Sequence, residues 1–331
     1  EQTRKELPIA PLSDELLGPR TRRIMESAQD LGYAWEKLDK YLYQDKCKAS
    51  CDRCFLGCPR GAKWSARMYV DEAVANGATL ITRAKVRRVL RENGKAVGVV
   101  YTKWGFDHRA YASKVVLAAG GIGTPVILRK SGVPRAGYDF FFDPLIAVFG
   151  SSRELFPRGE VPMAAGLHLA DEEYMMTDMT VHHSLFEGFS AQVGRVDRMF
   201  SHKNTMGIMV KVKDSLGGKL TDRGGVRKRL SRADKKKLDS GYQRAKKILK
   251  NAGARHIYKS WYIAAHPGGT AKVGEVVDTE LKTGIDNLYV CDCSVIPGAW
   301  GLPPTLTLIA LGKRLAARLA RQAGKAGTAA A

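Results

Sequence analysis

The sequence is poor in cysteine, in acidic side chains and in long apolar runs. Only 6 of its 331 residues are cysteine, which is too few to hold a chain of this length together as a disulfide-rich secreted domain. No stretch approaches the roughly 20 consecutive apolar residues that a membrane-spanning helix needs. The first residues, EQTRKELPIAPLSDE, lack the regions of a signal peptide. We therefore expect a cytoplasmic, globular protein with no membrane span.

Acidic residues are outnumbered, 33 Asp and Glu against 54 Lys and Arg, and the net charge of +21 is unevenly distributed. Eleven Lys or Arg and only two Asp lie between Val226 and Lys250. Residues 230–254 have the apolar spacing of a helix, begun by Ser231 and ended by Gly253. A solvated helix face is the favoured interpretation. Nucleic-acid binding is disfavoured because no aromatics interleave with these basic residues, whereas docking of an acidic partner stays open.

Four of the six cysteines lie within twelve positions and form the pattern C-x3-C-x2-C-x3-C-P, at Cys47, Cys51, Cys54 and Cys58. Iron–sulfur clusters are held by thiolates at such spacings, and this pattern differs by one residue from the bacterial ferredoxin pattern. Zinc is less favoured because only one C-x2-C knuckle is present, and unmetallated cysteines are the third alternative. We expect a [4Fe-4S] cluster, or [3Fe-4S] if only the last three cysteines bind.

The order of expected elements indicates an α/β protein, α+β overall, that contains a large antiparallel sheet. Helices are expected at 19–31 and 65–78, followed by strands within 79–105. A buried strand at 114–118, a glycine turn and a helix opening near Thr124 form a strand–turn–helix unit. Short alternating runs from 134 to 262 predict the antiparallel sheet, and the chain then returns to a strand and a proline-led helix.

Three segments appear in an order and at separations that are informative together: VVLAAGGIGTPVILRKSGV, HPGGTAKVGEVVDTELKTGIDNLYVCDCSVIPG and PPTLTLIALGKRLA. In these segments the sequence resembles the glucose–methanol–choline (GMC) oxidoreductases, FAD flavoproteins that oxidise alcohols. The resemblance implies a discontinuous FAD-binding, Rossmann-like domain at 1–132 and 263–322, incomplete at its N-terminus. It also implies a substrate domain at 133–262, and a disordered tail is expected at 323–331.

The resemblance implies roles for individual residues. His266 matches the active-site histidine that takes the proton of the substrate hydroxyl, a role that suits imidazole because its ordinary pKa is about 6.5. Cys293 stands where the family generally has Ala or Gly, so we interpret it as a small buried residue. The positions implied to bind the cofactor are Val86, Ala119, Gly120, Asp292, Cys293, Pro304 and Thr305.

Two features depart from the family. The second active-site residue, His or Asn in the family, falls at Pro303, which has no side-chain donor or acceptor; His182, His183 and Asn204 are candidates to replace it. The N-terminal βαβ unit with its G-x-G-x-x-G, which seats the ADP half of FAD, is not found in this sequence. A separate chain could supply it.

The cysteine segment is also similar to one in the dye-linked sugar dehydrogenase branch of the family. We therefore expect a dehydrogenase that oxidises an alcohol or sugar hydroxyl by hydride transfer to FAD. Its electrons would leave through the iron–sulfur cluster to an acceptor protein. The alternative is a non-catalytic electron-transfer or scaffold subunit that needs a partner chain for FAD.

Overall fold

The computed structural model describes the backbone of residues 1–328 and the side chains of residues 1–323. It divides into two compact units, each assembled from separate segments. Unit 1 comprises residues 1–78, 144–213 and 232–263, and unit 2 comprises residues 79–143, 214–231 and those from 264 onward. This division differs from the predicted one, because residues 1–78 pack with the segments that carry the large sheet.

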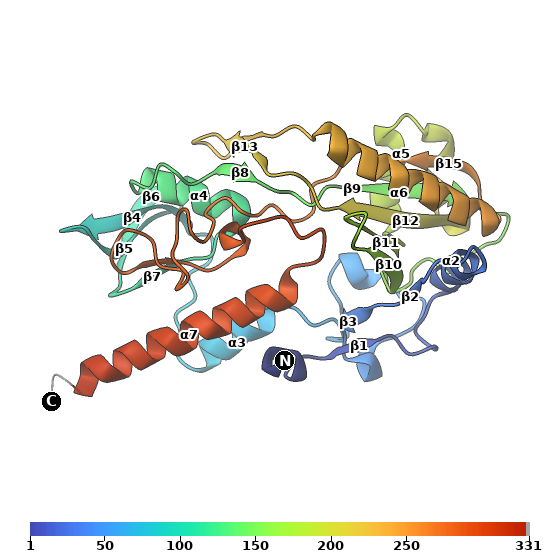
Figure 1. The fold of residues 1–331 in the computed structure, drawn as a ribbon. Helices are drawn as coiled ribbons and strands as arrows, with labels where there is room; N and C mark the ends of the chain where they lie inside the picture. The colour runs from blue at the N-terminus through green and yellow to red at the C-terminus, as the bar shows by residue number, and fades with distance from the viewer. Residues whose placement is uncertain (329–331) are drawn as a thin grey trace. The chain divides into compact units, whose positions relative to one another are not determined.

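Unit 1 is built on a six-stranded antiparallel sheet (Figure 1). Every residue of the inner strands β9, β12 and β11 is buried, so the predicted antiparallel sheet is also the core of this unit. The strands in spatial order are β15 (Arg255–Lys259), β9 (Leu145–Ser151), β12 (Thr205–Val212), β11 (Tyr174–Asp178), β10 (Ala165–Leu169) and β2 (Glu36–Lys37).

The basic helix α6 (Arg232–Asn251) packs on β12 and β9 (Figure 1, gold). Its Gly241 makes this close approach possible, because a Cβ there would lie 2.3 Å from Cγ1 of Val210. Four lysines on the opposite side are exposed, which agrees with a solvated charged face: Lys235, Lys236, Lys247 and Lys250. The other elements of unit 1 are α1 (Gln2–Lys5), β1 (Ile9–Pro11), α2 (Pro19–Asp30), β3 (Asp39–Tyr41), η1 (Gln44–Lys46), η2 (Arg53–Phe55), α3 (Arg67–Ala75), α5 (His183–Gln192), η3 (Val196–Arg198) and η4 (His202–Asn204).

Unit 2 contains the predicted strand–turn–helix unit. Strand β7 (Val115–Leu117) pairs in parallel with β16 (Leu288–Val290), and α4 (Gly120–Lys130) follows β7 directly. This pairing of strands that are far apart in sequence confirms the α/β class. The remaining elements are the sheet β4 (Lys85–Glu92), β5 (Lys95–Lys103) and β6 (Phe106–Tyr111), the sheet β8 (Tyr138–Phe140), β13 (Gly217–Leu220) and β14 (Val226–Arg227), η5 (Cys293–Val295) and α7 (Thr305–Thr328).

Two helix boundaries differ from the sequence-based expectation. Helix α4 begins at Gly120 and not near Thr124, so Pro125 lies inside it. Helix α7 continues to Thr328, into the segment 323–331 that was expected to be a disordered tail, and residues 329–331 lie outside the described residues. Within the described part of the chain, no helix is long and apolar enough to cross a membrane.

A buried ion pair fixes the start of α2 in unit 1. Nη1 of Arg20 lies 3.2 Å from Oε1 of Glu160, and both side chains are almost fully enclosed. The guanidinium also donates to the carbonyls of Pro157, His202 and Thr205. Glu160 in turn accepts backbone N–H groups at the start of α2, from Arg20 and Thr21. Through these contacts, the N-terminal segment that contains α2 packs as part of unit 1.

Replacing Glu160 by Gln should destabilise the protein strongly, because the buried charge of Arg20 would lose its counter-ion. We expect the free energy of unfolding in urea to fall by about 3 to 5 kcal/mol. The control is Asp14→Asn, which removes the exposed ion pair with Lys37 and should leave stability nearly unchanged. A Glu160→Gln protein as stable as the control would show that the buried pair does not hold α2.

Candidate functional site

Three turns of unit 2 pack closely against one another because glycine residues at their contacts have no side chain to hold them apart. A Cβ on Gly121 would lie 1.9 Å from the carbonyl oxygen of Pro267, and one on Gly268 would lie 2.6 Å from Sγ of Cys293. The hydroxyl of Thr270 donates to the Gly121 carbonyl at 2.8 Å. The segments around residues 119–124, 266–270 and 292–294 therefore form one packed junction.

The Asp292 carboxylate holds two of these turns together. It accepts the N–H of Gly120 at 2.9 Å, the hydroxyl of Thr124 at 2.5 Å and the N–H of Ser294 at 2.8 Å. Gly120 has a φ of +77°, a conformation that favours glycine, and nothing lies within 4 Å of the place where its Cβ would be. Its backbone therefore faces open space, as a turn that approaches a ligand must.

Cys293 is buried at the same junction. Burial, together with the carboxylates of Asp292 and Asp143, raises the pKa of its thiol to about 12. The side chain therefore stays protonated and apolar in character at neutral pH. This agrees with its interpretation as a small core residue.

His266 is partly exposed, with 26% of its side chain accessible, and one ring nitrogen faces a buried carboxylate. Nδ1 lies 3.3 Å from Oδ2 of Asp143, whose side chain is 1% exposed. The other oxygen of Asp143 accepts the N–H of Gly301 at 3.0 Å. The ring of His266 is therefore held through Nδ1, and no hydrogen bond to its Nε2 is found among the described residues.

A cavity of about 660 Å³ opens beside the turn after β7. Its lining is mostly apolar and includes Val86, Val116, Ala119 and Ile122, while Lys85 and Arg223 add positive charge. An apolar hollow with nearby cations and glycine backbone suits a dinucleotide, which has a flat base and a diphosphate. The structure thus places the predicted Val86 and Ala119 around one hollow.

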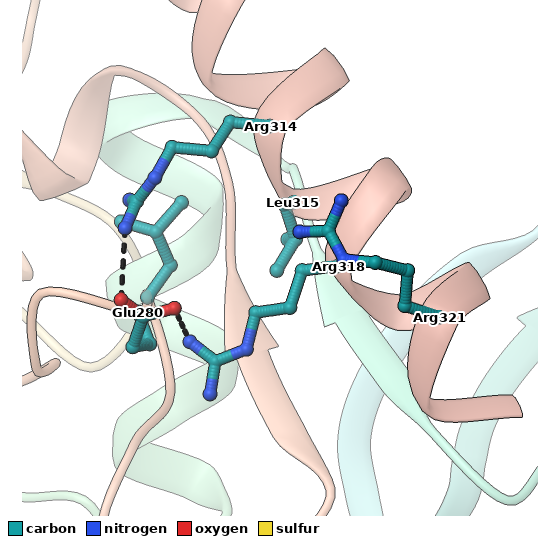
Figure 2. A pocket seen from close by; sticks show the side chains of 6 residues that line it. Glu280, Arg314, Leu315, Arg318 and Arg321 are labelled. Carbon is teal, nitrogen blue, oxygen red and sulfur yellow. Dashed lines mark hydrogen bonds and ion pairs between the residues drawn. The ribbon is translucent and has the colours of Figure 1, made fainter. Parts of the chain in front are cut away.

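The segment before α7 carries the remaining predicted cofactor residues. Pro304 is buried, Thr305 begins the helix, and the exposed Pro303 occupies the position of the missing second active-site residue. Further along, Arg314 and Arg318 both reach the carboxylate of Glu280 and line a smaller cavity of about 240 Å³ (Figure 2). These ion pairs fasten α7 to the turn at 278–281.

The three candidates to replace Pro303 all belong to unit 1. The imidazole of His182 caps α5, accepting the N–H of Ser184, so it has a structural role. His183 is exposed, and Asn204 ends the short helix η4. Sequence analysis missed Asp143, which faces His266 in the structure. An aspartate before a proline carries no signal of such a role, since it is equally common in turns.

The four clustered cysteines lie in a loop of unit 1 and all have free thiols. Cys47 and Cys58 pack against a small apolar core that includes Leu12 and Leu42. The loop is closely supported, because a Cβ on Gly159 would lie 2.3 Å from Cα of Asp52. Among the residues that the structure describes, however, no three His, Cys, Asp or Glu side chains are arranged to hold a metal ion, these cysteines included.

The thiols of this loop differ in acidity. Burial raises the pKa of Cys54, and the neighbouring thiolates of Cys47, Cys51 and Cys58 add to the effect. Burial also raises the pKa of Cys47. For Cys58, burial alone would raise the pKa, but hydrogen bonds from the backbone N–H groups of residues 60, 62 and 63 lower it overall. Cys54 therefore senses the charge of the other three sulfurs, and backbone N–H groups favour the thiolate form of Cys58.

Two family models match the chain. Both describe GMC oxidoreductases, the N-terminal one over residues 1–148 and the C-terminal one over residues 198–312. An uncharacterized protein of Methanocaldococcus jannaschii is 28% identical over 312 residues, which is 94% of this chain and 76% of that protein. A GMC-type oxidoreductase of Mycobacterium tuberculosis is 27% identical over 361 residues, covering 96% of this chain and 56% of that protein.

Two further similarities are with an enzyme sequence and a solved structure. A long-chain-alcohol oxidase of Arabidopsis thaliana is 22% identical over 351 residues, covering 82% of this chain and 46% of the oxidase. The crystal structure of pyridoxine 4-oxidase from Mesorbium loti superposes with a TM-score of 0.66 at 17% identity, over 94% of this chain and 71% of that one. The chain thus spans only about half the length of some curated relatives.

Because the pKa of Cys58 is lowered and those of Cys47 and Cys54 are raised, the metal-free protein should be alkylated first at Cys58. We expect iodoacetamide at about pH 7.5 to modify Cys58 several-fold faster than Cys47 or Cys54, as followed by peptide mass spectrometry. Cys291, which is half-buried outside the loop and has a raised pKa, serves as the slow control. Equal rates at all these thiols would contradict the proposed stabilisation by backbone N–H groups.

Proposed function

This chain belongs to the GMC oxidoreductase family, and from that premise we propose that it serves as an FAD-dependent dehydrogenase oxidising an alcohol or sugar hydroxyl. The observation that carries the proposal is the placement of His266, a partly exposed imidazole held by a buried carboxylate beside the glycine junction. The similarity to a long-chain-alcohol oxidase supports a hydroxyl as the reacting group.

The residues at the junction fit part of an FAD. The open space in front of the Gly120 backbone would receive the dinucleotide, with Ala119 and Val86 along the neighbouring cavity. Asp292 and Cys293 would border the same region, and Pro304 and Thr305 would approach from the start of α7. FAD, when bound, supplies the acceptor for a hydride leaving the substrate carbon.

His266 would act on the hydrogen of the substrate hydroxyl. Its Nε2 would accept the proton of the substrate hydroxyl, and the hydride of the C–H bond would go to the acceptor that bound FAD would supply. The alcohol thereby loses two hydrogens and becomes a carbonyl compound. Since Pro303 offers neither a donor nor an acceptor, His266 would carry the proton transfer without the second side chain that the family usually has at that position.

We further propose that electrons leave singly through an iron–sulfur cluster held by Cys47, Cys51, Cys54 and Cys58. The spacing of the cysteines, their mutual electrostatic influence and the N–H groups directed at Cys58 support this proposal. A closer approach of the four sulfurs than in the described structure would be needed. The acceptor would be a carrier protein, and the exposed lysines of α6 would suit an acidic one.

A non-catalytic role is the second candidate, and the exposed Pro303 favours it. In that case the chain would keep the fold but serve as an electron-transfer or scaffold subunit that relies on a partner chain for FAD. The βαβ unit that seats the ADP half would then come from that chain. The His266 experiment distinguishes the two candidates, because only the catalytic one needs this imidazole.

Replacing His266 by Ala should abolish reduction of the flavin by substrate without releasing the flavin. We expect the rate of anaerobic bleaching of the visible flavin band, tested with primary alcohols and sugars, to fall by about 10² to 10⁴. His108→Ala, a change at an exposed position on β6, is the control and should keep the parent rate. Unchanged turnover in the His266 variant would sink the proposed mechanism and leave the scaffold role.

Incubating the reduced protein with ferrous iron and sulfide without oxygen should produce a broad visible absorption that bleaches with reductant. Cys54→Ala should prevent this absorption, whereas Cys291→Ala, outside the loop, should not. Iron and sulfide contents measured on the same samples give the cluster type. A Cys54 variant that still acquires the absorption would refute the assignment of the cluster to this loop.

A further inference from the structure

The carboxylate of Asp143 faces the imidazole of His266, with Oδ2 lying 3.3 Å from Nδ1. We propose that Asp143 is a positioning residue that fixes the tautomer and the orientation of His266, so that Nε2 carries the lone pair needed to accept a proton. The inference rests on the proposed function for its consequence in catalysis. Its structural part, the tautomer, can be measured on the protein without turnover.

The main chains that carry Asp143 and His266 are tied together. Phe141 and Gly268 exchange two backbone hydrogen bonds, each of 3.1 Å. The carbonyl of Phe142 accepts the N–H groups of both Ala265 and His266, at 3.1 and 2.9 Å. Four hydrogen bonds across so few residues leave the carboxylate and the imidazole little freedom to drift apart.

Asp143 is also held in a conformation that needs support. Its φ is +45°, in the left-handed region that an L-residue seldom adopts. The carboxylate of Asp214 accepts the N–H groups of Phe142 and Asp143 and is itself paired with Nζ of Lys228 at 3.0 Å. Both side chains of that pair are nearly fully buried. The backbone around Asp143 is therefore fixed by the carboxylate of Asp214 and by the hydrogen bonds to residues 265–268.

The hydrogen-bonding capacities of the carboxylate and the imidazole then determine the tautomer of His266. An ionised carboxylate only accepts hydrogen bonds, so the nitrogen that faces Asp143 must carry the hydrogen. In the neutral imidazole this assigns the proton to Nδ1 and leaves Nε2 as an acceptor. A base that takes a proton from a hydroxyl needs this form and cannot work through an Nε2 that already bears hydrogen.

The contact with Gly301 makes Asp143→Asn a selective test. Oδ1 of Asp143 accepts the Gly301 N–H at 3.0 Å, so in the variant the amide oxygen must keep that place. The amide NH₂ must then face Nδ1 of His266, because the reverse orientation would set two donors against each other. Nδ1 would become the acceptor, and the hydrogen of the neutral ring would move to Nε2. The shape of the site is preserved while the tautomer is inverted.

The test is ¹⁵N NMR of histidine-labelled protein, at a pH where the ring is neutral, with the His266 signals assigned from the His266→Ala variant. The parent protein should show a protonated Nδ1, and Asp143→Asn should show a protonated Nε2. Asp286→Asn, an exposed carboxylate paired with Lys282, is the matched control and should keep the parent pattern. A parent protein with hydrogen on Nε2 would overturn the proposal, even if the Asn variant failed to fold.

The same variants should then be compared in substrate-driven flavin reduction. We expect Asp143→Asn to lower the rate constant at saturating substrate by about 10² or more while flavin content and thermal midpoint stay near the parent values. An inverted tautomer with an unchanged rate would show that His266 is not the base, which contradicts the proposed function. An unchanged tautomer with a lowered rate would instead reject the positioning role and leave the proposed function standing.

Discussion

The pairing of residues 141–143 with residues 265–268 is the constraint on which the candidate site depends. A single carbonyl, that of Phe142, accepts two N–H groups, and the neighbouring Phe141 and Gly268 complete the ladder. Because residues 141–143 and 265–268 are joined by backbone hydrogen bonds, a side-chain substitution in either segment can leave the distance between them unchanged. The carboxylate, the imidazole and the glycine junction take their places from this backbone framework.

The chain's local elements could be largely predicted, because they depend on spacing that is visible in the sequence. The strand–turn–helix unit at β7 and α4 and the buried antiparallel sheet were confirmed for this reason. The place of residues 1–78 could not be predicted, since they attach to the sheet through partners far away in the sequence. Examples are the ion pair between Arg20 and Glu160, 140 positions apart, and the pairing of β2 with β10. Sequence periodicity carries no information about such a distant partner.

The same limit of prediction from sequence applies to the individual residues of the candidate site. His266, Ala119, Gly120, Asp292 and Cys293 could be named because each lies in a segment that resembles the family, and the structure brings their segments together. Asp143 and its supports Asp214 and Lys228 lie outside those segments, in ordinary turns. Their relation to the histidine arises from a left-handed residue and the four backbone hydrogen bonds between the two segments. These geometric features leave no trace in composition.

The separation between Arg20 and Glu160 also bears on how the protein is made. Arg20 leaves the ribosome 140 residues before its counter-ion, and the last segment of unit 1 ends only at residue 263. At a synthesis rate of about 5 to 20 residues per second, Glu160 would be synthesised roughly 7 to 30 s after Arg20. The start of α2 therefore remains unanchored through much of translation.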